Sequence, residues 1–330
     1  MQPFFLQGSA GRLFAVYTPA ADGCQHGHDV LVMPPFAEEM NRSRRMTSAL
    51  ARRLSAQGCG TLLLDLFGTG DSEGEFAQAR LDIWLDDLGR GLDWLAARRA
   101  PAMAMVGLRM GALLALMLAA RAPATLTRLV LWQPVLTGEQ MLTQFLRVLA
   151  MNAGGTTAAL RARLQAGETL DVAGYELSAG LATAIDELRL GNLPMPAGTA
   201  LLWLDVVAQA DRPLQAAAGR LAEQWRRECR SVDTRRVVGE PFWGMLEPPL
   251  VPGLVEQTAR VAAKVEHHLV LRHLQPPGAE QAVEGGGGDP PFRQLLEPGR
   301  RLDAVLGQQL EHPCGRQTTA FLVGRARFQG

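Results

Sequence analysis

The chain has 330 residues, with 33 basic and 33 acidic side chains and 47% hydrophobic residues. This length allows one large domain or two modest ones, and the apolar fraction is sufficient for a buried core. The balanced charge excludes the strongly basic surface of a general nucleic-acid binder, so we expect no nucleic-acid partner.

Cysteine spacing and apolar runs exclude two further classes of protein. The four cysteines lie far apart without a CxxC pair, at Cys24, Cys59, Cys229 and Cys314. We therefore expect no metal site, no cofactor and no disulfide framework. The longest apolar run, residues 112–120, is too short to span a membrane, and the N-terminus lacks the pattern of a signal peptide. A soluble, unprocessed cytoplasmic protein is expected.

Short β-rich apolar runs alternate with helical patterns along the first part of the chain. The predicted strands are Leu13–Thr18, Val30–Met33, Thr61–Leu66, Met103–Gly107, Leu129–Gln133, Ala200–Asp205 and Arg235–Gly239. Helices are predicted at about residues 43–57, 80–99, 111–122 and 213–229. This alternation indicates an α/β fold, with a mostly parallel sheet and helices on both faces.

Two segments depart from this alternation. Residues 137–196 form a predicted insertion of helices and loops, which is either a lid over the carboxyl ends of the strands or a decoration without a gating role. Residues 256–330 contain the run Gly285–Gly288 and no sustained period. We expect an α/β domain at 1–255, followed by a tail that is disordered or is translated from a shifted reading frame.

The most informative motif joins a predicted strand to a predicted helix through the pattern G-x-R-x-G at residues 107–111. In α/β-hydrolases, G-x-S-x-G at this junction forms the nucleophile elbow, whose glycines leave room for a strained turn. Here Arg109 occupies the nucleophile position. A guanidinium that stays protonated cannot attack an acyl carbon.

Two other turns support the same fold. The segment from Asp65 to Ser72 has the pattern D-x-x-G-x-G-x-S, which follows a strand in many α/β-hydrolases. Pro34 and Pro35 stand where an H-G turn is usual, and neither has a backbone N–H to donate. By position, the N–H groups of Phe36 and Met110 would form the oxyanion hole.

Together, PPFAEEMNRSRRM, DLFGTGDSEGEF, GLRMGALLAL, LWQPVLTGEQMLTQFLR and VVGEPFWGMLE resemble the exosortase A system-associated hydrolase 2 family of α/β-hydrolases. The resemblance covers roughly residues 1–255, and its most specific part runs from Glu38 to Arg45. It implies an α/β-hydrolase fold in a cytoplasmic protein associated with exopolysaccharide production and the sorting of PEP-CTERM proteins. Components of that system are the partners it implies.

A Ser-His-Asp triad needs a histidine after the last strand, near residues 239–243, and the stretch after this strand offers Glu240 and Glu247 but no imidazole. No histidine lies between His28 and His267, and the nearest candidates, His267, His268 and His273, fall in the tail. The acid position is filled, because Asp205 ends a predicted strand. The sequence therefore lacks two of the three triad members.

The role of Arg109 has two interpretations. It sits at a helix N-terminus, where an anionic or polar ligand could bind between its guanidinium and the N–H groups of Phe36 and Met110. Alternatively, Arg109 forms an internal ion pair with Asp205, Glu38, Glu39 or Asp71. The two can coexist if one acid is shared with a ligand, so the candidate ligand-binding residues are Phe36, Glu38, Glu39, Arg109, Met110 and Asp205.

Two hypotheses for function follow. The first is a catalytically degenerate protein of the α/β-hydrolase fold that binds a polar or anionic ligand or a partner. The second is an active ester or acyl hydrolase with a non-standard nucleophile, for which Ser72 and Ser43 are the only serines near the expected pocket. The missing serine and histidine favour the first, and the family resemblance favours the second.

Overall fold

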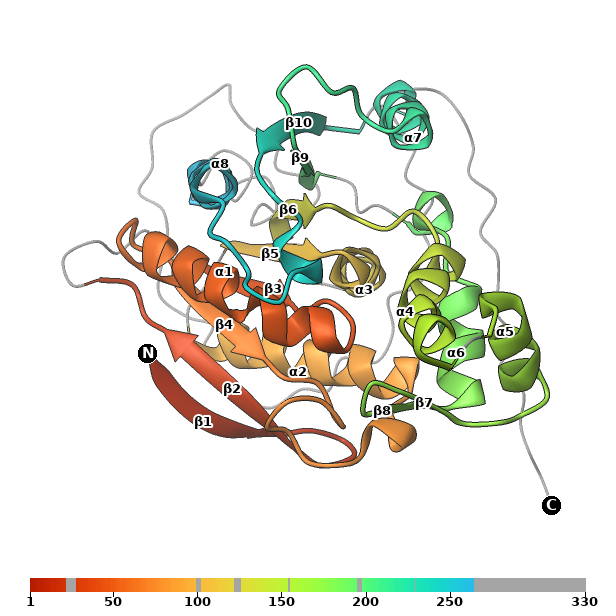
Figure 1. Ribbon diagram of the computed structural model, residues 1–330. Helices are drawn as coiled ribbons and strands as arrows, with labels where there is room; N and C mark the ends of the chain where they lie inside the picture. The colour runs from red at the N-terminus through yellow and green to blue at the C-terminus, as the bar shows by residue number, and fades with distance from the viewer. Residues whose placement is uncertain are drawn as a thin grey trace, which may run out of the picture. The chain divides into compact units, whose positions relative to one another are not determined.

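The computed structural model describes residues 1–21, 28–98, 102–121, 126–153, 155–194, 198–228 and 230–263. Its centre is an eight-stranded sheet with the order β1-β2-β4-β3-β5-β6-β9-β10 (Figure 1). The strands are β1 (Gln2–Gln7), β2 (Arg12–Thr18), β3 (His28–Met33), β4 (Gly60–Leu64), β5 (Ala102–Leu108), β6 (Leu126–Trp132), β9 (Ala200–Val207) and β10 (Val232–Val238). Only the pairs β1–β2 and β2–β4 are antiparallel. The predicted mostly parallel sheet is confirmed.

All seven predicted strands are present, with ends that differ by a few residues, and β1 is additional. The sequence gives little sign of β1, because its side chains are exposed or half-buried and it pairs with β2 alone. An edge strand of this kind lacks the buried apolar run by which the other strands are found.

Helices cover both faces of the sheet. Helix α1 (Glu38–Ser55) and helix α8 (Pro252–Ala262) pack together on one face, and α2 (Leu81–Arg98), α3 (Met110–Ala119) and α7 (Ala216–Arg227) contribute to the core on the other face (Figure 1). Helix α1 begins five residues before its predicted start, because its first turn is charged and carries no apolar period. Helix α3 is apolar around its whole circumference, as expected for a helix that is buried on all sides.

The insertion contains helices α4 (Gly138–Ala153), α5 (Thr157–Gln165) and α6 (Ala179–Asp186), together with a short 3-10 turn, η2 (Leu190–Asn192). It also contains a hairpin that the sequence did not predict, formed by β7 (Leu170–Val172) and β8 (Tyr175–Leu177). Ala173 and Gly174 form its two-residue turn, and both have positive φ, the geometry that hairpin turns of this length favour. A bridge between Thr137 and Arg189 closes the base of the insertion.

Helix α8 extends past the domain boundary that the sequence suggested at residue 255. Thr258, Ala259 and Ala262 are buried, and the Thr258 hydroxyl accepts a 2.7 Å hydrogen bond from Trp132 Nε1 of β6. The prediction of a poorly packed tail is therefore wrong for residues 256–262. Residues 264–330, including the predicted disorder or frameshift and the histidines from His267 onward, lie outside the described residues.

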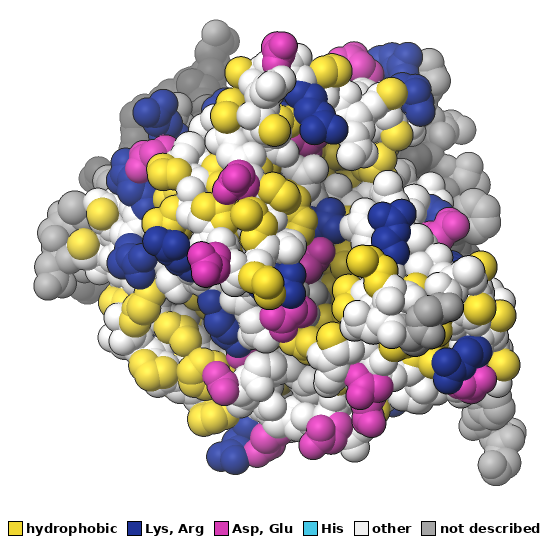
Figure 2. Space-filling model, in the orientation of Figure 1, with side chains coloured by type: hydrophobic (Ala, Val, Ile, Leu, Met, Phe, Trp, Pro, Cys, Tyr) yellow, Lys and Arg dark blue, Asp and Glu magenta, His cyan; other side chains and the backbone are white. Residues whose placement is uncertain are grey.

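The surface carries charges of both signs. Figure 2 shows acidic and basic side chains interspersed on one face, with no continuous basic area there. Within the described ranges, no helix is long and apolar enough to cross a membrane.

Candidate functional site

The turn between β5 and α3 has the backbone of a nucleophile elbow. Arg109 adopts φ 56° and ψ −115°, a strained conformation for a residue other than glycine. A Cβ atom on Gly107 would lie 2.4 Å from the Gly111 oxygen, and one on Gly111 would lie 2.5 Å from the Met33 oxygen. Both glycines are thus required by close backbone approach, as the motif predicted.

The Arg109 guanidinium is buried and already has partners. Its Nε and one terminal nitrogen each lie 3.2 Å from Glu39 Oε1, and the same terminal nitrogen donates to Gln144 Oε1. The guanidinium carbon lies 5.4 Å from the ring centroid of Trp243. The side chains of Arg109 and Glu39 are only 9% and 18% exposed.

Of the four acids that the sequence offered as partners for Arg109, Glu39 is the one that pairs with it. Within the described residues, Arg109 forms no ion pair with Asp205, Glu38 or Asp71. Burial raises the pKa of Glu39, and the neighbouring Arg109 opposes that rise. The positive charge at the nucleophile position is therefore compensated inside the protein.

The expected oxyanion hole retains its backbone donors. Phe36 and Met110 are both buried, and within the described residues neither backbone N–H has a hydrogen-bond acceptor. Ala37, which follows Phe36, has φ 49° and is the N-cap residue of α1. The Phe36 ring packs edge-on against Phe145 of the insertion, with ring centroids 4.9 Å apart. The turn is held in place by packing as well as by its backbone.

Asp205 lies in β9 near its carboxyl end, where a triad acid would stand. It is 6% exposed, and its Oδ1 accepts a 2.7 Å hydrogen bond from Trp203 Nε1. Burial raises the pKa of Asp205, while the Trp203 hydrogen bond acts in the opposite direction. Among the described residues, Asp205 thus has Trp203 as a hydrogen-bond partner and no imidazole.

Arg109 and Asp205 line one pocket of about 370 Å³ that is partly open to solvent. Four glutamines share its wall: Gln133, Gln140, Gln144 and Gln215. Gln133 follows β6 with φ 43°, and its side-chain oxygen accepts a 2.8 Å hydrogen bond from the Val206 N–H. The sequence analysis did not select these glutamines. A signal was present, because Gln133 directly follows a strand, and Gln140 and Gln144 are spaced to lie on one face of the next helix.

The first turns of α1 connect several loops around the site. Glu38 accepts a 3.2 Å hydrogen bond from the Tyr175 hydroxyl of the insertion, and Arg42 donates 2.9 Å to the Gly244 carbonyl. Arg44 forms a bidentate pair with Asp65 at 3.2 and 2.8 Å, and Arg45 donates to the Pro248 carbonyl at 3.3 Å. Arg42 also forms a local ion pair with Glu38, one turn before it, at 3.4 Å. The arginines at the start of α1 thus combine local pairing with contacts that hold segments distant in sequence together.

In a Ser-His-Asp triad, the histidine would come from the loop after β10. Here that loop brings an aromatic ring to Arg109. The 3-10 turn η3 (Phe242–Gly244) follows Glu240, and Trp243 lies against Arg109. Nothing in this part of the described chain supplies an imidazole.

The two alternative serines lie in different settings. Ser72 Oγ accepts a 2.8 Å hydrogen bond from the Phe14 N–H and donates 2.6 Å to the Asp65 carbonyl, so it stabilises the turn after β4. Ser43 is 1% exposed, and its hydroxyl has no partner within the described residues. Neither serine hydrogen-bonds to a candidate base.

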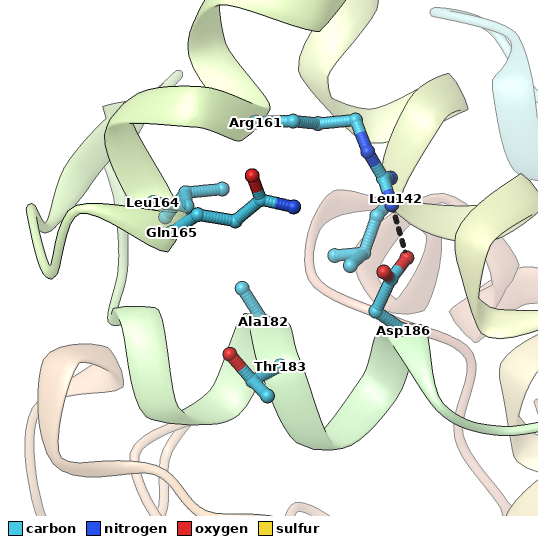
Figure 3. A pocket seen from close by; sticks show the side chains of 7 residues that line it. All are labelled: Leu142, Arg161, Leu164, Gln165, Ala182, Thr183 and Asp186. Carbon is cyan, nitrogen blue, oxygen red and sulfur yellow. Dashed lines mark hydrogen bonds and ion pairs between the residues drawn. The ribbon is translucent and has the colours of Figure 1, made fainter.

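A separate, smaller pocket of about 280 Å³ lies inside the insertion, between α4, α5 and α6. Figure 3 shows Arg161 of α5 reaching Asp186 of α6 at one end of this pocket, with Leu142 beside them. The pair ties two helices of the insertion together, and none of the residues that line this pocket lines the pocket at Arg109.

Comparison with known proteins identifies the architecture. Residues 30–198, just over half of the chain, match the protein family described as serine aminopeptidase, S33. No curated protein matches the sequence.

Solved structures of similar fold include Est1E from Butyrivibrio proteoclasticus with ferulic acid bound (15% identity, TM-score 0.55, 79% of this chain and 96% of that chain). Another is mouse alpha/beta hydrolase domain-containing protein 10 (15% identity, TM-score 0.51, with the same shares covered). A third is the bottromycin epimerase BotH (19% identity, TM-score 0.50, 79% of this chain and 98% of that chain). At these identities the likeness shows the fold alone, and the predicted α/β-hydrolase fold is confirmed.

Proposed function

The chain belongs to the serine aminopeptidase S33 family of α/β-hydrolases, and we propose that it is a catalytically degenerate member that binds a polar ligand. The observation that carries this proposal is Arg109 at the elbow, with its guanidinium held by Glu39 and Gln144. A protonated guanidinium has no lone pair to offer an acyl carbon. The elbow turn therefore presents a hydrogen-bonding group instead of a nucleophile.

The remaining triad positions support the same proposal. Asp205 accepts a hydrogen bond from Trp203, and the loop after β10 contains Trp243 and Glu240 but no histidine. Among the described residues, no base hydrogen-bonds to Ser43 or Ser72 to activate it. The structural neighbours also include a protein named as an epimerase, so this fold by itself does not determine hydrolysis.

The ligand site that we propose uses the pocket at Arg109 and Asp205, with Glu39 paired to Arg109. Of the other candidate residues, Phe36 and Met110 line a different pocket, and Glu38 lines neither of the two. Glu39 compensates the charge of Arg109, and glutamine amides line the wall. Amides both donate and accept hydrogen bonds, which suits hydroxyl and amide groups. The charge balance therefore favours a neutral polar ligand over an anion.

Thermal unfolding in the presence of glucose, glucuronate and inorganic phosphate tests this site. We expect glucose to raise the midpoint more than phosphate does, and Gln144→Ala to reduce the shift. Arg161→Ala, in the separate pocket of the insertion, is the control and should leave the shift unchanged. A shift with phosphate alone that Arg109→Ala removes would instead establish an anion site.

The insertion at 137–196 has a place in this proposal as a cover for the pocket. Gln144 and Gln140 of α4 belong to its wall, and Tyr175 of β8 donates a hydrogen bond to Glu38, the first residue of α1. Burial and the nearby Glu38 raise the pKa of Tyr175 to about 12, so its hydroxyl keeps its proton and stays a donor. Tyr175→Phe should weaken the attachment of the insertion, measured as faster amide hydrogen exchange in β7 and β8.

The biological setting rests on the sequence resemblance. The segment from Glu38 to Arg45 and the four other matching stretches favour a cytoplasmic role in exopolysaccharide production and PEP-CTERM protein sorting. Deletion of the gene in its source bacterium should lower secreted polysaccharide, and the wild-type gene should restore it. Unchanged polysaccharide and unchanged PEP-CTERM protein processing would remove this part of the proposal.

A further inference from the structure

A second pocket lies on the α1 face of the sheet, between α1 and the outer strands β2 and β4. Its volume is about 680 Å³, part of it open to solvent, which is within the range of small-molecule sites. Most of its wall is apolar and comes from β2, β4, the end of β3 and α1: Phe14, Val16, Leu63, Val32 and Met40. In Figure 2, apolar side chains gather over this edge of the molecule.

Ser43 gives this pocket a polar group in its interior. The residue is 1% exposed, lines the pocket, and its hydroxyl has no hydrogen-bond partner within the described residues. It lies on the buried stripe of α1, among Met40, Met46 and Leu50. A buried hydroxyl without a partner is unfavourable, so a group that bonds to it would be retained.

The charges near the pocket are already balanced. Arg44 and Asp65 both line it, and they pair with each other through two hydrogen bonds of 3.2 and 2.8 Å. Thr47 also satisfies its own hydroxyl, which donates to the Arg44 carbonyl at 3.1 Å. Among its side chains, the pocket therefore offers the buried Ser43 hydroxyl and the half-buried Ser48 hydroxyl, and its charged side chains Arg44 and Asp65 are paired.

This pocket is distinct from the one at the elbow. The two share no lining residue, and the pair Pro34–Pro35, which precedes Phe36 of the oxyanion turn, forms part of the wall of the second pocket. A molecule bound here would touch the turn from the side of α1 without meeting Arg109.

We propose that this pocket binds a neutral aliphatic molecule carrying one hydroxyl or carbonyl group, which hydrogen-bonds to Ser43. The apolar walls take the aliphatic part, and the paired Arg44 and Asp65 give no preference for an anion. The volume of the pocket and its apolar walls suit a chain about as long as that of a medium-chain alcohol.

Calorimetric titration of the full chain with 1-octanol tests this proposal. Saturable binding is expected for the wild type, with octanoate binding more weakly. Ser43→Ala should weaken binding about fivefold, the effect of losing one hydrogen bond. Val16→Trp, which fills the pocket from β2, should abolish saturable binding. Ser231→Ala, an exposed serine outside the pocket, is the matched control and should bind as the wild type does.

Circular dichroism establishes that each variant is folded, and Leu63→Trp serves as a second filling variant if Val16→Trp does not fold. Gln144→Ala alters the elbow pocket and should leave octanol binding unchanged, which separates this proposal from the proposed function. Absence of saturable binding, or binding that Ser43→Ala and both filling variants leave intact, would overturn the proposal.

Discussion

The turn at residues 107–111 contains Arg109, and the loop after β10 contacts it. The two segments differ in how closely they match the corresponding parts of an α/β-hydrolase site. The turn keeps both glycines, the positive φ at position 109 and the N–H of Met110. The loop keeps no catalytic side chain and presents the Trp243 ring. The strained elbow backbone thus places Arg109 against Glu39, whereas the loop contacts Arg109 through the Trp243 ring.

The largest expected effect tests the backbone of the elbow. Gly111→Ala would place a Cβ atom 2.5 Å from the Met33 oxygen and 2.7 Å from the Pro34 oxygen. Because both obstacles are backbone atoms, we expect the free energy of unfolding to fall by more than about 3 kcal/mol, measured by urea denaturation.

Gly89→Ala is the matched control, since a Cβ atom there meets nothing within 4 Å and the residue lies within α2. Its helical position should make the substitution neutral or stabilising by up to about 1 kcal/mol. Equal losses in the two variants would mean that the elbow is no more constrained than an ordinary helix.

The second-largest effect on stability is expected from breaking the ion pair between Arg109 and Glu39. Glu39→Gln leaves the buried Arg109 without its counterion, so we expect a loss of about 3 kcal/mol in the free energy of unfolding. Asp86→Asn removes the partner of Arg90 in a pair whose side chains are nearly half exposed, and should change stability very little. A Glu39 variant as stable as the wild type would contradict an internal role for the pair.

Asp87 is a contrasting case, since it is a buried carboxyl that forms no ion pair within the described residues. Its side chain accepts a 2.9 Å hydrogen bond from the Phe67 N–H, and burial raises its pKa to about 6. The unfolded value is about 3.9, so the folded state binds the proton more strongly. Stability from this group therefore rises as the pH falls from above 6 to about 4.

Asp87→Asn should be more stable than the wild type at pH 8, by an amount on the order of 1 kcal/mol, and should lose that advantage near pH 4. Thermal unfolding at a series of pH values measures the difference. Asp86→Asn serves again as the neighbouring control, because Asp86 has a lowered pKa and should give no gain at pH 8. A gain for Asp87→Asn that does not vary with pH would show that the carboxylate is not its source.

The smallest effect tests the loop after β10. Trp243→Leu removes the ring from Arg109, and we expect a loss of about 1 kcal/mol, the size of a single cation–π contact. Urea denaturation beside Gly111→Ala gives the direct comparison. A loss as large as that of the glycine variant would mean that the loop is constrained as strongly as the elbow.

Much of the fold could be predicted because its signals are local. The buried strands, the glycines at 107 and 111 and the position of Asp205 follow from apolar runs and spacing. The hairpin at 170–177 could not be found this way, because each of its strands has three residues. Strand β1 is exposed and lacks the necessary pattern.

The site could be predicted only in part, for a different reason. Sequence reasoning placed Arg109 and offered four acids as partners, but choosing Glu39 depends on the rotation of α1 about its axis. The contact with Gln144 depends on how the insertion packs, and the contact with Trp243 depends on the path of an irregular loop. No local sequence pattern predicts these three tertiary contacts of Arg109.

We propose that no nucleophile operates at this site, and intact-mass measurement after exposure to a fluorophosphonate probe is the decisive test. We expect an unchanged mass for the wild-type chain under conditions that fully label an active serine hydrolase. One adduct per chain, removed by Ser43→Ala or Ser72→Ala, would contradict it.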